Sequence, residues 1–220
     1  MPEPKINKIY SRQSSNLTTF IYLSGQITGP EDYIEEIQSL REATAGDKIE
    51  IYINTEGGNV HTAIQWVNAI RNCEGTITGV IDAICHSAGT YIFLACDQWR
   101  VNKNCLMMIH NYSSGAYGKG EELVHGVISN DKWVKAMMSD IYDSFLTADE
   151  LEKVIEGKDL YLTSEEILER LPQVMDARKL EEDIAQEEAI NSVREQFKQL
   201  EEEEADEGSD STRIQECPAE

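Results

Sequence analysis

The hydrophobic positions of the chain repeat with two periods, and the shorter period indicates β-strands. Apolar runs rich in β-branched residues occupy residues 20–24, 76–85, 99–101 and 106–110, as expected for buried strands. Isoleucines at positions 49, 51 and 53 alternate with Glu, Tyr and Asn, which predicts a strand with one wetter face.

The helical period fills most of the intervals between these strands. Helices are predicted over about residues 30–46, 60–70 and 121–145, with a further helix after Ser87. Their inward faces are expected to carry Tyr33, Ile34, Ile37 and Leu40; Val60, Ile64, Val67 and Ile70; and Leu123, Val127, Val134, Met137, Ile141 and Phe145. Strands that alternate with helices indicate an α/β core.

Glycine, proline and capping residues predict where elements begin and end. Gly25 is expected to end the first strand, and Gly57-Gly58 to form a turn after the isoleucine strand. Capping boxes at residues 147–150 and 163–166 predict two short helices, the second of which ends before Pro172.

The distribution of charge predicts three regions in a chain of 220 residues. The net charge is −22, and residues 176–220 contribute 16 acidic and 5 basic side chains, a net charge of −11. We expect a folded domain over residues 1–175, an amphipathic helical extension over 176–204 and an acidic tail over 205–220 that is too charged to pack. The apolar stripe of the extension comprises Leu180, Ile184, Ile190, Val193, Phe197 and Leu200.

The composition argues against several classes of function. A strong negative charge disfavours nucleic-acid binding, because phosphate contacts need clustered Lys and Arg. No 18-residue apolar stretch is present, so no membrane span is expected. The five cysteines show no metal-ligand or C-x-x-C spacing, which predicts reduced thiols in a cytoplasmic protein with no metal and no cofactor.

The segment Cys85-His86-Ser87-Ala88-Gly89-Thr90 joins a predicted strand to a predicted helix. A serine at such a turn lies beside N–H groups that have no intrahelical partner, as a nucleophile for acyl transfer requires. Serine is also a common N-cap residue, so Ser87 alone leaves both interpretations open.

A serine nucleophile needs a base, and the chain has four histidines. His61 and His125 fall on predicted helices and are expected at the surface. His86 adjoins Ser87 in the chain, so its side chain is expected to point to the opposite face. His110 ends an apolar strand before a glycine-rich loop, which makes it the better candidate.

Four segments of the chain occur together in one known family. They are Ile51-Tyr52-Ile53-Asn54-Thr55-Glu56-Gly57-Gly58, Ser87-Ala88-Gly89, Met108-Ile109-His110 and Asp159-Leu160-Tyr161-Leu162-Thr163-Ser164-Glu165-Glu166. Their order and spacing resemble the proteolytic subunit of Clp protease, over about residues 9–174. The resemblance implies an α/β fold of the Clp/crotonase-like type, made of stacked ββα units with a protruding long helix and a glycine-bearing ribbon, the handle, at residues 111–145.

The resemblance also implies a mechanism. Ser87 would be the nucleophile, His110 the general base and Asp159 the group that orients the histidine in an ATP-dependent serine endopeptidase. The N–H groups of Gly58 and Ala88 would form the oxyanion hole.

The same resemblance implies expectations about substrates and partners. Gly57 and Asn111 are expected to bind an extended, unfolded protein or peptide substrate. Heptameric rings are expected to stack in pairs as a homo-oligomeric tetradecamer, fed by an AAA+ unfoldase. Glu50 occupies a strand position that is usually aromatic in the unfoldase docking pocket, and Glu56 replaces the usual proline before the two glycines.

Three other hypotheses remain open at this point. The chain could be a catalytically silent assembly subunit of a Clp-like complex, although all three triad residues are present. It could be an acyl-CoA enzyme of the related crotonase fold, which needs no such triad. It could also be a specialised Clp-like processing protease, for example one for viral capsid maturation.

Overall fold

The computed structural model describes residues 10–12, 17–115 and 117–210, and only the backbone of residues 10–12, 197 and 199–210. Contacts within the chain divide it into two units, Met1–Gln173 and Val174–Glu220. The first contains the sheet and all candidate site residues, and the second is helical.

A single β-sheet forms the centre of the first unit. Within the described residues its strands are β1 (Tyr10–Arg12), β2 (Thr18–Ile27), β3 (Lys48–Gly58), β4 (Thr76–His86), β5 (Gln98–Val101), β6 (Leu106–Ile109) and β7 (Leu160–Thr163). Their order is β1-β2-β3-β4-β6-β7, with β5 also paired to β4. The pairs β2–β3, β3–β4 and β4–β6 are parallel, and the outer pairs β1–β2 and β6–β7 are antiparallel. The predicted α/β core is confirmed.

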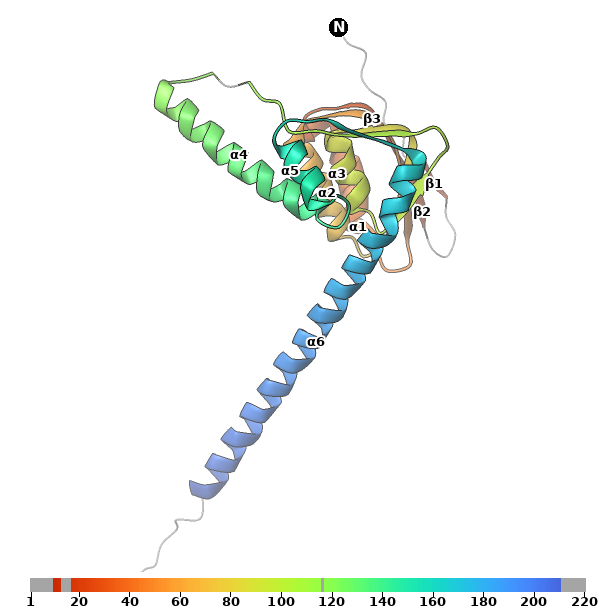
Figure 1. Ribbon diagram of the computed structural model, residues 1–220. Coiled ribbons are helices and arrows are strands. Elements are labelled where there is room, and N and C mark those ends of the chain that lie inside the picture. Colours follow the sequence, from red (N-terminus) through yellow and green to blue (C-terminus); the bar gives the residue numbers. More distant parts are fainter. Residues whose placement is uncertain (1–9, 13–16, 116, 211–220) are drawn as a thin grey trace, which may run out of the picture. The chain divides into compact units, whose positions relative to one another are not determined.

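Helices connect the parallel strands and cover the sheet (Figure 1). They are the short 3₁₀ helix η1 (Pro30–Tyr33), α1 (Ile34–Glu42), α2 (Val60–Arg71), α3 (Ala88–Ala95), α4 (Gly120–Tyr142), α5 (Ala148–Ile155) and α6 (Ser164–Asp210). Helix α3 packs against β3 and β4, and α2 packs against α3. Helix α4 projects away from the sheet in Figure 1, which agrees with the expected protruding helix. Residues 111–115 and 117–119, where a ribbon was expected, form no strand.

The alternation in β3 buries one of its faces. The side chains of Ile49, Ile51 and Ile53 are at most 2% exposed, whereas Glu50 and Tyr52 on the opposite face are half-buried. The predicted wetter face is therefore confirmed. The apolar burial on the helix-covered side is the main source of stability for this layer.

Two strands are longer than predicted, because their glycines lie within the sheet. Strand β2 continues through Gly25, whose φ of 72° accompanies a shift of register in the β2–β3 pairing. Strand β3 continues through Gly57 and Gly58, which pair with Gln26 and Ile27. Glycine within a strand allows a bend in the strand or a close approach to the neighbouring strand. The predicted strand end and glycine turn were wrong.

Two predicted inward residues face outward. Ile34 is 65% exposed, because the preceding turn is 3₁₀ and its tighter winding rotates Ile34 away from the face that Ile37 and Leu40 bury. Val127 is also exposed, and it lines a pocket instead of the core.

The two capping boxes are confirmed, but the helix after the second does not stop at Pro172. Glu166 accepts hydrogen bonds from the N–H and hydroxyl of Thr163, and α6 then runs from Ser164 through Pro172 to Asp210. Proline removes the hydrogen bond to the carbonyl four residues earlier, that of Leu168. Leu168 and Pro172 are both exposed, so this carbonyl can be hydrated and the helix continues.

The second unit is the distal part of α6. Its helix extends past the predicted end at residue 204, and residues 211–220 of the predicted tail lie outside the described residues. The apolar side chains of Leu180, Ile184, Ile190 and Val193 are exposed, and those of Phe197 and Leu200 are not described. In the part of the chain that the structure describes, no helix combines the length and apolar character needed to cross a bilayer.

Candidate active site

Ser87 lies on a strained turn between β4 and α3. Its φ of 53° and ψ of −126° place it in a region that residues other than glycine rarely adopt. Although Ser87 stands at the N-cap position of α3, its side chain makes no capping hydrogen bond. The hydroxyl is therefore used elsewhere, and the interpretation of Ser87 as a simple cap is not supported.

Strand pairing brings His110 to this hydroxyl. Strands β4 and β6 are parallel neighbours with His86 opposite Met108, and the Ser87 N–H donates to the Met108 carbonyl at 2.7 Å. Both chains leave the sheet at the same edge, and His110 Nε2 lies 2.7 Å from Ser87 Oγ. The two residues are 23 positions apart in the sequence and form a hydrogen-bonded pair in the fold.

A buried polar network holds the turn that carries Ser87. The Thr90 hydroxyl donates to the Ser87 carbonyl at 2.6 Å and shares a 2.5 Å hydrogen bond with the Tyr142 hydroxyl. Both Thr90 and Tyr142 are fully buried. This network connects the serine turn to the end of α4, and nothing in the sequence pattern distinguished these residues from ordinary core positions.

Glycine residues of β3 lie directly against the serine turn. A Cβ atom added at Gly57, whose φ is 90°, would be 2.6 Å from Ser87 Cβ and 3.1 Å from the Ala88 nitrogen. The Ala88 N–H opens α3 and has no intrahelical acceptor. The absence of a side chain at Gly57 therefore keeps the space in front of this N–H open.

Asp159 and His110 are the residues that follow the last pair of the β6–β7 ladder. Ile109 pairs with Leu160 in this antiparallel ladder, so one further step of the register sets His110 opposite Asp159. The Asp159 side chain is exposed, and the described residues contain no hydrogen bond between it and His110. The structure thus brings two of the predicted triad residues into contact, and the third follows the same ladder without contacting them.

His86 does not contact the Ser87 hydroxyl. Its Nε2 is buried and finds no hydrogen-bond partner among the described residues. Desolvation lowers the pKa of His86, the nearby His110 lowers it further, and Glu56 acts in the opposite direction. An imidazole in this setting favours the neutral form but has no route to the serine proton, as expected from the sequence.

Asn111 is engaged within the protein. Its side-chain NH₂ group donates to the Ile155 carbonyl at 2.8 Å, and its side-chain oxygen Oδ1 accepts a hydrogen bond from the Tyr112 N–H at 2.8 Å. The side chain thereby fixes the segment after His110 to α5. Only its main chain is left for the predicted contact with substrate.

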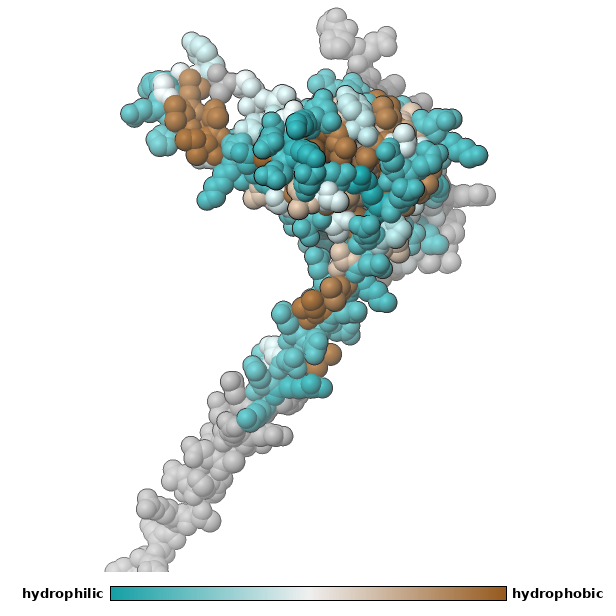
Figure 2. All heavy atoms as spheres, in the orientation of Figure 1, coloured by the Kyte–Doolittle hydropathy of each residue, from teal (hydrophilic) through white to brown (hydrophobic). Residues whose placement is uncertain are grey.

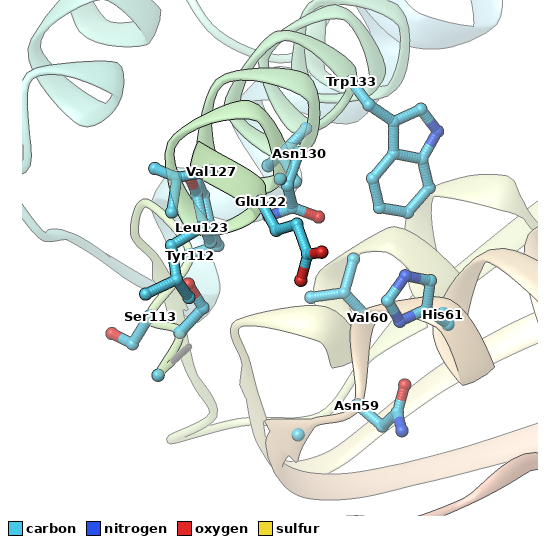
Figure 3. A pocket seen from close by; sticks show the side chains of 15 residues that line it. Asn59, Val60, His61, Tyr112, Ser113, Glu122, Leu123, Val127, Asn130 and Trp133 are labelled. Atoms are coloured by element: carbon cyan, nitrogen blue, oxygen red, sulfur yellow. The ribbon is translucent and has the colours of Figure 1, made fainter. Parts of the chain in front are cut away.

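A pocket of about 470 Å³ opens next to the end of β3 (Figure 3). It lies between the start of α2, the loop after His110 and the first half of α4, and Gly58 and Tyr112 form part of its wall. His61 stacks on Trp133 at its far side, with ring centroids 5.3 Å apart. His61 is exposed, as the sequence predicted, and its place in the pocket wall could not be predicted from the sequence.

The wetter face of β3 carries a polar cluster. Arg100 on β5 forms an ion pair with Glu50 at 2.7 Å and lies over the ring of Tyr52. The hydrogen bond from Arg100 lowers the pKa of Glu50. Tyr22 stacks on Tyr52, so this face combines aromatic rings with a charged pair.

The described residues contain no group of three His, Cys, Asp or Glu side chains close enough to hold a metal ion. Acyl-transfer hydrolases use a serine hydroxyl that is hydrogen-bonded to an imidazole and lies beside N–H groups without an intrahelical acceptor.

A comparison with protein families identifies the family of this chain. The Clp protease family model matches residues 3–170, so the chain belongs to the Clp protease family. It is accordingly a protease, and the predicted family and Clp-type α/β fold are confirmed. A comparison with curated proteins gives no match.

Proposed function

We propose that this protein is a serine endopeptidase in which Ser87 is the nucleophile and His110 the general base. The observation that carries the proposal is the 2.7 Å contact between Ser87 Oγ and His110 Nε2 on a turn of positive φ. A non-glycine residue in this conformation costs about 1–3 kcal/mol, and such strain is retained where a site requires it.

Acylation follows from this geometry. As Ser87 Oγ attacks the carbonyl carbon of the scissile bond, His110 Nε2 takes the hydroxyl proton. The carbonyl oxygen becomes an oxyanion in the tetrahedral intermediate, where the N–H groups of Gly58 and Ala88 stabilise it. The imidazolium then gives its proton to the leaving amine as the C–N bond breaks. Water, deprotonated by the same imidazole, hydrolyses the acyl-enzyme.

Asp159 is proposed to orient His110 during this cycle. The imidazolium gains a positive charge in the transition state, which a carboxylate one register step away stabilises. Because Asp159 is exposed in the free chain, its contact with His110 is expected to form when substrate or a neighbouring subunit covers the site. Asp159→Asn should therefore lower kcat more than it raises KM.

Peptide substrates are proposed to bind in extended form. Main-chain groups at Gly57 and Asn111 border the serine turn, and an extended peptide can pair with such groups whatever its side chains. Unfolded proteins and peptides are therefore the expected substrates.

Assembly into stacked heptameric rings is proposed from the surface of α4. This helix exposes Val124 and Ile128, the latter 61% exposed, and the preceding loop exposes Tyr117. Figure 2 shows hydrophobic residues gathered at the outer end of this helix. An apolar patch of this kind on a protruding element is typical of a contact between subunits.

The polar cluster on β3 bears on the docking of an AAA+ unfoldase. Glu50, at a position that is usually aromatic in the family, is paired with Arg100. A charged pair disfavours an apolar docking segment, because the pair would lose water without gaining a partner. This observation favours the second candidate, a specialised processing protease that works without the usual unfoldase.

The test combines peptide hydrolysis with electron microscopy of the purified full chain. Ser87→Ala should form the same particles as the wild type and lower kcat by several orders of magnitude. Ser139→Ala, an exposed serine on α4, is the matched control and should hydrolyse peptides at the wild-type rate. Hydrolysis by Ser87→Ala at a comparable rate, or none by the wild type, would reject the proposal.

A further inference from the structure

The pocket between α2 and α4 combines apolar walls with one acidic group. Val60, Leu123, Val127 and Trp133 supply apolar surface. Among the described residues that line the pocket, Glu122 is the only acidic one, and none is Lys or Arg. A cavity of about 470 Å³ falls within the usual range for ligand sites, about 300–1,000 Å³.

The Glu122 carboxylate is directed into this pocket. Figure 3 shows it extending from α4 toward Val60 and His61 on the opposite wall. Its nearest cation is Lys119, at 4.0 Å, and both side chains of that pair are largely exposed, 72% for Glu122. An exposed pair at this distance is weak, so a cationic ligand can displace it.

The pocket adjoins the position that the scissile carbonyl is proposed to occupy. Gly58, whose N–H is proposed to bind the oxyanion, forms part of the pocket wall. A scissile carbonyl at that position would bring the side chain on the adjoining Cα next to the space between α2 and α4.

We propose that this pocket selects peptides with Lys or Arg immediately before the scissile bond, and that Glu122 is the specificity-determining residue. The inference rests on the proposed peptidase function. The methylene stem of a basic side chain packs on Val127 and Trp133 while its head group reaches the carboxylate. Charge-assisted hydrogen bonds then hold the head group, with Asn130 on the same wall as a further polar partner.

The same geometry disfavours acidic side chains at this position. Asp or Glu would enter beside a like charge with no basic residue in the pocket wall to compensate. The net charge of −22 also concentrates basic peptides near the protein, but that effect does not depend on one residue. A test must therefore separate Glu122 from the overall charge.

The experiment uses two fluorogenic peptides that differ only in arginine or its uncharged isostere citrulline before the scissile bond. For the full-length wild type, kcat/KM should favour the arginine peptide by about fivefold to tenfold. Glu122→Gln should reduce this ratio to about one. Glu121→Gln, which changes the net charge equally on an exposed position outside the pocket wall, should keep the wild-type ratio.

A ratio near one in the wild type, or an equal loss in Glu121→Gln, would overturn the inference while leaving the peptidase proposal intact. Binding of the same two peptides to Ser87→Ala, measured by calorimetry, is independent of hydrolysis. If the wild type cleaves neither peptide but the arginine peptide is bound more tightly, and Glu122→Gln removes that preference, the selectivity stands and the proposed chemistry fails. Equal binding of the two peptides rejects the selectivity in either case.

Discussion

Replacement of Gly57 by alanine should inactivate the enzyme through the position of Ser87. The added Cβ would lie 2.6 Å from Ser87 Cβ, 2.8 Å from the His86 carbonyl oxygen and 3.1 Å from the Ala88 nitrogen. All three atoms belong to the turn that carries the nucleophile, and two of them are backbone atoms. The clash therefore cannot be relieved by rotating a flexible side chain.

The expected magnitude has two parts. Non-bonded carbon atoms ordinarily approach to about 3.5–4.0 Å, so the turn or β3 must move by about 1 Å. A displacement of that size at a reacting atom lowers the rate by about 10²-fold. Alanine at a φ of 90° also destabilises the fold by about 1–2 kcal/mol.

The assay is kcat/KM for a fluorogenic peptide, with the melting temperature measured in parallel. Gly46→Ala is the matched control, because Gly46 has a φ of 102° in the turn before β3, away from the serine. It should lower the melting temperature without a comparable loss of rate. The reasoning is refuted if Gly57→Ala keeps its activity within threefold, or if Gly46→Ala loses as much.

Three further outcomes are expected. His110→Ala should be nearly inactive and His86→Ala should stay active, because His110 contacts the Ser87 hydroxyl and His86 does not. An active His110→Ala together with an inactive His86→Ala would show that the base has been assigned wrongly. The hydrogen bond from Arg170 lowers the pKa of Glu150 to about 2, below its unfolded value of 4.5, so this pair stabilises the fold above about pH 4.5 and loses its effect as the pH falls toward 2. Glu150→Gln should thus lower the melting temperature by about 2–4 °C at pH 7 and not at pH 2, and equal shifts at both values would exclude an ionic origin. Deletion of residues 176–220 removes the exposed apolar stripe of α6, which we expect to cover a neighbouring subunit. Size-exclusion profiles of the truncated protein should therefore show weaker assembly. Unchanged profiles would mean that this part of α6 is an independent appendage.

The core of the fold could be predicted because burial leaves a period in the sequence. The alternating isoleucines of β3 identify a strand whatever its neighbours are. Gly25, Gly57 and Gly58 were misinterpreted because positive φ serves a bulge or a close approach as well as a turn, and only the neighbouring strand distinguishes these uses. Pro172 was misinterpreted because the hydration of one carbonyl decides whether a helix stops.

The candidate site also contains residues that the sequence indicates and residues that only the fold reveals. Ser87 and His110 were candidates because each follows a predicted strand, and their roles were assigned from the family resemblance. The parallel pairing of β4 and β6 brings the ends of both strands to one edge of the sheet. The pocket residues Glu122 and Trp133 belong to a helix that the sequence predicts only as amphipathic. The packing of α4 beside α2 is needed to show which cavity they line. Thr90 and Tyr142 are likewise indistinguishable from core residues until their hydrogen bonds are seen.

The most direct test of the central claim is covalent labelling of the full-length protein with a serine-reactive phosphonate, followed by mass spectrometry of its peptides. A hydroxyl activated by His110 should form one adduct, on Ser87, in step with the loss of peptide hydrolysis. Ser87→Ala should remain unlabelled. An adduct on a different serine, or an unlabelled Ser87 in an enzyme that still cleaves peptides, would contradict the account.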